Sequence, residues 1–107
     1  MALAHAVAGA TRPSQVITWT RDDGTAEDLT GATITGKIRS LADGTTRDIA
    51  GTLSVTDAAA GEFTWAYAAA DVATPGRFQV QFTAAFGTGA TPARTDATNW
   101  EVKRALA

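Results

Sequence analysis

The chain has 107 residues, a net charge of −2 and no cysteine, which together exclude several classes of protein. Its length predicts one small domain with its own core. The absence of cysteine excludes disulfide bonds and thiolate metal sites and suits folding in a reducing cytoplasm. The nine Lys and Arg residues are dispersed along the sequence, so we expect no nucleic-acid or membrane partner.

The first thirteen residues are mostly small and apolar, with Leu3 and Val7 flanking the single histidine, His5. They have no basic leader and only a short apolar run, so we expect no secretory signal, and no other stretch has the length of a membrane-spanning helix. Three interpretations stay open for this segment: a short first strand, an added edge strand or a loose arm. We therefore predict an N-terminal arm or first edge strand over residues 1–13 and a single β-sandwich domain over residues 14–107.

Residues 15–21 (QVITWTR) are rich in β-forming side chains and predict a strand. Its inward residues are predicted to be Ile17 and Trp19, because a tryptophan side chain is too large to leave in water without a reason. The Asp-Asp-Gly-Thr sequence at 22–25 predicts a turn that uses Gly24 at positive φ.

Period-two alternation predicts further strands at residues 32–39 and 51–56, and residues 47–49 lead into the second of them. An Asp-Gly pair at 43–44 marks the turn between them. The side chains expected to face the core from these strands are Ile34, Ile38, Leu53 and Val55.

The stretch 61–86 is expected to form the centre of the core, because apolar residues alternate with polar ones in both of its halves. Between the halves, residues 68–75 are too long for a tight hairpin and predict a corner with a short helical turn at 69–73. Val80 and six of the chain's eight aromatic residues share the inward parity of these two strands; the six are Phe63, Trp65, Tyr67, Phe78, Phe82 and Phe86.

Residues 87–96 combine Gly, Thr and Pro without periodicity and predict an exposed loop. Residues 97–104 predict a last strand with Trp100 and Val102 facing inward. Short strands separated by turn signals, without an amphipathic helix, predict an all-β fold. We expect an antiparallel β-sandwich of immunoglobulin-like kind with about seven strands, and a small β-barrel is the alternative.

A series of turn and strand motifs extends over most of the chain in a fixed order. The series is Asp-Gly, DLTGATI at 28–34, a Lys- and Arg-bearing strand, a second Asp-Gly, VTD at 55–57, Gly61 before an aromatic strand, Asp71, and Pro75-Gly76 before Phe78 and Val80. This order resembles the N-terminal domain of phage baseplate upper proteins and related immunoglobulin-like domains of tailed-phage virions.

The resemblance implies a virion structural or adaptor protein, made in the host cytoplasm, that packs against other virion proteins and copies of itself in a symmetric array. In the baseplate upper proteins this domain anchors longer chains whose later parts hold receptor-binding proteins. Because this sequence ends at Ala107, soon after its predicted last strand, we expect a small component of the tail, baseplate, neck or capsid surface. We expect no enzymatic activity, cofactor or metal.

Few residues suggest chemistry. His5 has no cysteine or nucleophilic serine near it in the sequence and is expected to be exposed or at an interface. An acidic group around one turn departs from the spacing of calcium loops and is interpreted as turn and cap residues, as are Asp57 and Asp71. This acidic group consists of Asp22, Asp23, Glu27 and Asp28.

The Gly-rich sequence at 86–91 precedes no helix, so it predicts a flexible loop and not a phosphate-binding loop. The competing hypothesis for function is a carbohydrate- or cell-surface-binding module, which would bind a host-surface glycan on an exposed aromatic. Trp19 and Trp100 are the candidates for that aromatic, although core packing of the aromatics is the favoured prediction.

Overall fold

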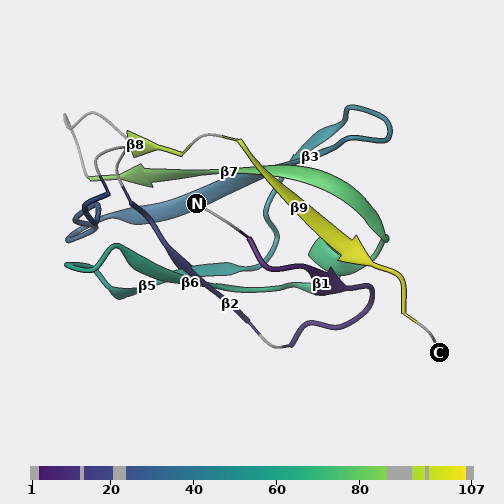
Figure 1. Cartoon of the computed structure of the whole chain (residues 1–107), viewed down its shortest axis with the longest axis horizontal. Coiled ribbons are helices and arrows are strands. Elements are labelled where there is room, and N and C mark those ends of the chain that lie inside the picture. The colour runs from purple at the N-terminus through teal and green to yellow at the C-terminus, as the bar shows by residue number, and fades with distance from the viewer. Residues whose placement is uncertain (1–2, 13, 21–23, 87–92, 96, 106–107) are drawn as a thin grey trace.

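The computed structural model describes residues 3–12, 14–20, 24–86, 93–95 and 97–105. Over these residues the chain forms nine strands in two sheets and one short 3-10 turn. The sheets stack face to face (Figure 1), and the described strands do not close into a barrel. The predicted all-β sandwich is confirmed, with two more strands than expected because two pairings involve only two residues each.

Sheet A, the larger sheet, has the strand order β1-β9-β7-β3-β4, and β8 also pairs with β7. Its pairs are antiparallel except for β1 with β9, which run parallel. The longest ladder joins β3 to β7 over eight residue pairs, from Thr33↔Ala85 to Ser40↔Phe78. The strands are β1 (Ala6–Val7), β3 (Thr33–Ser40), β4 (Thr46–Asp48), β7 (Gly76–Ala85), β8 (Ala93–Arg94) and β9 (Thr98–Lys103).

Sheet B has the order β2-β6-β5, and both of its ladders are antiparallel. Its strands are β2 (Gln15–Thr18), β5 (Thr52–Asp57) and β6 (Glu62–Ala66). Sheet A contains the order β9-β7-β3, and it faces the order β2-β6-β5 in sheet B. Immunoglobulin domains have the same arrangement, with strands G-F-C in one sheet and B-E-D in the other. The immunoglobulin-like arrangement therefore forms here without the disulfide found in antibody domains.

The core lies between the sheets and is built from the alternate residues predicted to face inward. The Phe63 ring of β6 meets the Phe82 ring of β7 with ring centres 5.0 Å apart, edge to face. The ring centres of Trp65 in β6 and Trp100 in β9 are 4.7 Å apart, so both sheets contribute to one aromatic cluster. The predicted inward residues that are buried are Ile17, Trp19, Ile34, Ile38, Phe63, Trp65, Tyr67, Phe78, Val80, Phe82, Trp100 and Val102.

Three predicted core residues are only half-buried, although they pack against the core. Leu53 and Val55 belong to β5, which is an edge strand of sheet B and is therefore covered from one side only. Phe86 directly follows the last residue of β7. The inward parity of these residues is correct, and position within the sheet decides how deeply each is buried.

The predicted loop at 87–96 is only partly described, because residues 87–92 and 96 lie outside the described residues. Within it, Ala93–Arg94 form β8 on β7, so the prediction of an exposed loop is wrong for this part. Thr95 is buried and continues the contact, since its backbone N–H donates to the Phe82 carbonyl and its hydroxyl accepts the Phe82 N–H, both at 3.0 Å. Pairing with β7 therefore forms a strand in a segment whose sequence shows no strand periodicity.

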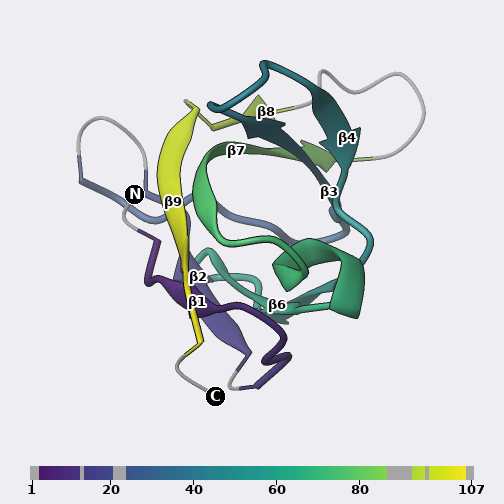
Figure 2. The same cartoon turned by 90° about the vertical axis from the view of Figure 1, so that its right-hand side faces the viewer.

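One turn directly precedes β6 and another follows it. The chain turns at Gly61 with φ of +68°, and a Cβ there would lie 2.5 Å from the Trp19 carbonyl oxygen, so glycine is required for both reasons. The predicted helical turn is confirmed as a 3-10 turn at Ala69–Val72. Figure 2 shows it beside the β4–β5 connection.

The N-terminal segment runs beside β9, to which β1 adds a parallel edge strand. Ala6 is buried, while His5 and Val7 are exposed. The Ala8 N–H donates to the Lys103 carbonyl and the Gly9 N–H donates to the Val72 carbonyl, both at 2.8 Å. Of the three interpretations left open by the sequence, the structure shows an added edge strand.

Candidate functional site

The broadest solvent-facing surface is the outer face of sheet A, which we define by the outward residues of β3, β4, β7, β8 and β9. Period-two alternation buries one set of side chains and leaves the other set in solvent. Here the outward set is rich in charge and amide groups: Lys37, Arg39, Asp48, Arg77, Gln79, Gln81, Arg94, Asn99, Glu101 and Lys103.

One ion pair is formed on this face, between Lys37 and Asp48 on neighbouring strands, and both side chains are exposed. Arg77 and Glu101 are also cross-strand neighbours but do not approach within ion-pair distance. Among the described residues, Arg39, Arg77, Arg94 and Lys103 have no ion-pair partner within the chain. These cations are available to another molecule.

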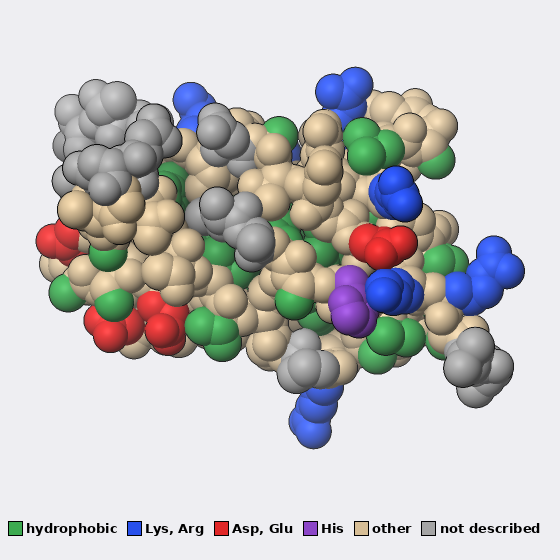
Figure 3. All heavy atoms as spheres, viewed as in Figure 1, with side chains coloured by type: hydrophobic (Ala, Val, Ile, Leu, Met, Phe, Trp, Pro, Cys, Tyr) green, Lys and Arg blue, Asp and Glu red, His purple; other side chains and the backbone are tan. Residues whose placement is uncertain are grey.

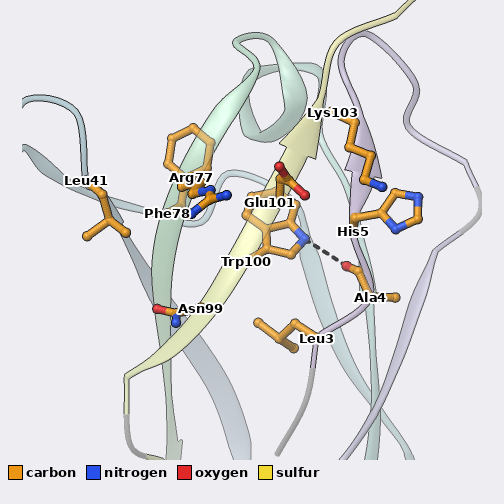
Figure 4. A pocket seen from close by; sticks show the side chains of 10 residues that line it. All are labelled: Leu3, Ala4, His5, Leu41, Arg77, Phe78, Asn99, Trp100, Glu101 and Lys103. Atoms are coloured by element: carbon orange, nitrogen blue, oxygen red, sulfur yellow. Dashed lines mark hydrogen bonds between the residues drawn. The ribbon is translucent and has the colours of Figure 1, made fainter.

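A hollow of about 490 Å³ opens on this face where the N-terminal segment lies beside β9 (Figure 4). Its rim carries Arg77 and Glu101, and Lys103 extends alongside His5. Phe78 and Trp100 lie beneath it, 9% and 2% exposed. The hollow is a charged depression over a closed core and gives no access to the aromatic cluster.

A hydrogen-bonded group anchors the N-terminal segment behind this hollow. The Gln15 side chain accepts the Ala4 N–H, and its amide donates to the Ala4 carbonyl at 3.2 Å and to the Tyr67 hydroxyl at 2.7 Å. The Trp100 indole N–H donates to the same Ala4 carbonyl at 3.1 Å. Three elements distant in sequence therefore meet at Ala4, and no sequence motif indicated this.

Replacing Gln15 with alanine is expected to lower the free energy of unfolding by about 1–3 kcal/mol, because a part-buried group of polar atoms loses its partners. Urea denaturation followed by circular dichroism measures the loss. Ser14→Ala, at the exposed neighbouring position, serves as the control and is expected to change stability by less than about 0.5 kcal/mol. Equal urea midpoints for the two variants would contradict the structural role of Gln15.

Asp71 is the one buried carboxylate among the described residues, with 1% of its surface exposed. It lies in the 3-10 turn and accepts the Ala68 N–H at 3.1 Å, so the cap role predicted from the sequence is correct but incomplete. Its other donors come from distant elements: the Ala50 N–H at 2.9 Å, the Gly51 N–H at 2.8 Å, the Trp65 indole N–H at 3.2 Å and the Arg47 guanidinium at 3.1 Å.

This environment sets the charge of Asp71. Burial raises the pKa of its carboxyl group, but the hydrogen bonds from Ala50, Ala68, Arg47 and Trp65 outweigh burial and hold the pKa below its usual range. The carboxylate is thus ionised at neutral pH with all of its donors in place. Since it has neither an open approach nor a raised pKa, the arrangement holds the β4–β5 connection and the 3-10 turn together and does not suit acid–base chemistry.

The other acidic candidates lie at turns. Asp28 accepts both the backbone N–H and the hydroxyl of Thr30, and Asp57 accepts the Ala60 N–H at 3.4 Å, as expected for turn residues. Asp22 and Asp23 lie outside the described residues, as does most of the Gly-rich sequence at 86–91. Within the part of the chain that the structure describes, no three His or acidic residues are grouped as a metal site would require, and no helix is long and apolar enough to span a membrane.

Both tryptophans considered for a glycan platform are in the core. Trp19 is 5% exposed and packs near Phe63, and Trp100 is 2% exposed and packs on Trp65 and Phe78. Neither offers a ring face to solvent. The functional surface that sequence analysis missed is the outer face of sheet A, whose strands are far apart in the sequence.

Comparison of the sequence with protein-family models and with curated proteins finds no match to either.

Proposed function

We propose that this chain is a structural or adaptor protein of a phage virion, in the tail, baseplate, neck or capsid surface, and that it acts by protein–protein packing in a symmetric assembly. The virion setting is supported by the resemblance of the motif order between residues 16 and 102 to the virion domains named above. In this proposal the chain performs no catalysis and binds no cofactor.

The observation that supports a packing role is the contrast between the closed interior of the domain and the charged outer face of sheet A. The interior is filled mainly by aromatic and aliphatic side chains and one fully hydrogen-bonded carboxylate. The outer face of sheet A, in contrast, presents four cations that have no ion-pair partner among the described residues. Surface charge of this kind steers association and selects partners. Repetition of one such contact around a ring or lattice multiplies a weak affinity, so a small sandwich can assemble firmly.

The proposal is tested on phage particles purified from cells that make this chain. Quantitative mass spectrometry is expected to find the chain in the particles at a constant ratio to the other virion proteins. Deletion of its gene is expected to give incomplete or non-infectious particles. Absence of the chain from the particles, together with complete infectious particles after deletion, would refute the proposal.

A further inference from the structure

Charge is unevenly divided between the two sides of the sandwich. The outer face of sheet A carries five basic residues (Lys37, Arg39, Arg77, Arg94 and Lys103) and two acidic residues (Asp48 and Glu101), which give +3. The whole chain has nine basic and eleven acidic residues, so four basic and nine acidic residues, or −5, remain elsewhere in the sequence. A chain of net charge −2 therefore presents one cationic face.

The outer face of sheet B has the opposite character. Its described strand residues include no Lys or Arg, and Glu62 lies in its central strand with Asp57 directly across from it on β5. In Figure 3 most of the acidic side chains in view lie at the left and lower left, over the β5–β6 end, and one lies among the basic side chains on the right. Most basic side chains in view lie at the top and right, and one projects at the bottom. The two broad faces are thus complementary in charge.

Exposed apolar side chains also lie on these two faces. Among the described residues, the large hydrophobic side chains that are exposed are Val7 (40%) on β1 and Leu41 (48%) directly after β3, both of sheet A, and Val16 (62%) on β2 of sheet B. Val16 is paired with Thr64 on β6 and lies two residues before Thr18, the partner of Glu62. Each face thus combines charge with apolar surface, as protein interfaces do.

We propose that this chain self-associates head to tail, with the outer face of sheet A in one copy docking on the outer face of sheet B in the next. The inference deepens the proposed function, on which it rests, by naming the surfaces through which copies meet. Because the two surfaces differ, the contact is heterologous and repeats around a closed ring or along a filament. A two-fold contact of sheet A with itself would bring cations together and is disfavoured.

The dimensions of the sandwich allow such a contact. Its extents are 44 × 26 × 25 Å, so a broad face can cover the roughly 800 Å² per partner of a standard interface. A nucleic acid is the less suitable occupant of the cationic face, since Asp48 and Glu101 lie among the cations and the rest of the chain repels phosphate.

The first test is sedimentation velocity of the full chain from about 20 μM to about 1 mM. At about 50 mM NaCl the average sedimentation coefficient is expected to rise with concentration. At about 500 mM NaCl the association is expected to be at least about tenfold weaker, because salt screens the charges. A parent protein that stays monomeric at low salt, or an association that salt does not weaken, would overturn the inference.

The second test uses charge reversal on each face. Arg39→Glu with Arg77→Glu makes sheet A acidic, and Asp57→Lys with Glu62→Lys makes sheet B basic. Each double variant is expected to be monomeric alone at low salt. An equimolar mixture is expected to associate. The acidic sheet A of one variant can then dock on the basic sheet B of the other, and the basic sheet A of the second variant can dock on the acidic sheet B of the first. Failure of the mixture to associate, with both variants folded by circular dichroism, would overturn the inference.

The matched control is Arg12→Glu with Arg104→Glu, which changes the net charge from −2 to −6, as does the sheet A variant, but reverses residues outside that face. This control is expected to associate within about threefold of the parent. Binding of a DNA duplex of about 20 base pairs by a monomeric parent, lost in the sheet A variant, would replace self-association with nucleic-acid binding. A monomeric chain that is still a component of particles would overturn this inference alone and leave the proposed function standing.

Discussion

Replacing Asp71 with alanine is expected to lower the free energy of unfolding by about 3–5 kcal/mol, since removal of a buried ionised partner is among the most destabilising single changes. Three backbone N–H groups and the Trp65 indole lose their acceptor, and the Arg47 guanidinium loses its ion-pair partner. Urea denaturation at neutral pH measures the loss. Asp48→Ala is the control, because its exposed ion pair with Lys37 is worth less than about 1 kcal/mol.

The effect of Asp71 has a defined pH dependence. Its pKa is lowered in the folded state, so its contribution is fully present above the unfolded pKa of about 3.9 and is lost as pH falls through the folded pKa. The difference in stability between the parent and Asp71→Ala is therefore expected to shrink below about pH 4. A difference that is small at neutral pH, or that grows on acidification, would contradict the role assigned to this carboxylate.

Replacing Trp65 with alanine is expected to lower the free energy of unfolding by about 3–5 kcal/mol, because it opens a cavity at the centre of the core. The Trp65 side chain is fully buried, and its ring centres lie 4.8 Å from Tyr67, 4.7 Å from Trp100 and 6.0 Å from Phe82. It also donates the indole hydrogen bond to Asp71. Thermal and urea denaturation measure the loss.

Two variants distinguish packing from hydrogen bonding at Trp65. Trp65→Phe keeps a ring but removes the N–H donor and part of the volume, so its cost is expected to be smaller than that of Trp65→Ala. Val16→Ala removes two methyl groups from a residue that is 62% exposed and is expected to change stability by less than about 0.5 kcal/mol. Similar losses for Val16→Ala and Trp65→Ala would show that the aromatic cluster is not the centre of the core.

The inward-facing residues were predictable because burial follows a local period of two. In β2 the parity was ambiguous between Val16 and Ile17, and the size of Trp19 decided it correctly: Ile17 is 1% exposed and Val16 is 62% exposed. The same argument placed Phe63 and Trp65 of β6 in the core. Alternation could not show the half-burial of Leu53, since the edge position of β5 depends on which strands pair.

The candidate surface was less predictable than the core. Alternation showed that Arg39, Arg77 and Lys103 face outward, but their strands are far apart in the sequence and only the pairing of β3, β7 and β9 brings them onto one face. The basic residues are therefore dispersed along the sequence although several of them share one face of the folded chain. The folded chain collects five of the nine on one side.

By itself, the sequence determined which side chains of the predicted strands face inward, because strand alternation acts over a few neighbouring positions. It did not indicate the burial of Leu29 and Val72, which lie outside the strands. Only the tertiary structure decided that Asp71 joins the β4–β5 connection to the 3-10 turn, since its donors at Ala50 and Gly51 are 21 and 20 residues away. It likewise decided that β1 runs parallel to β9 and that the cations share one face. Contacts between distant segments depend on how the strands pair, and strand pairing is a property of the whole chain.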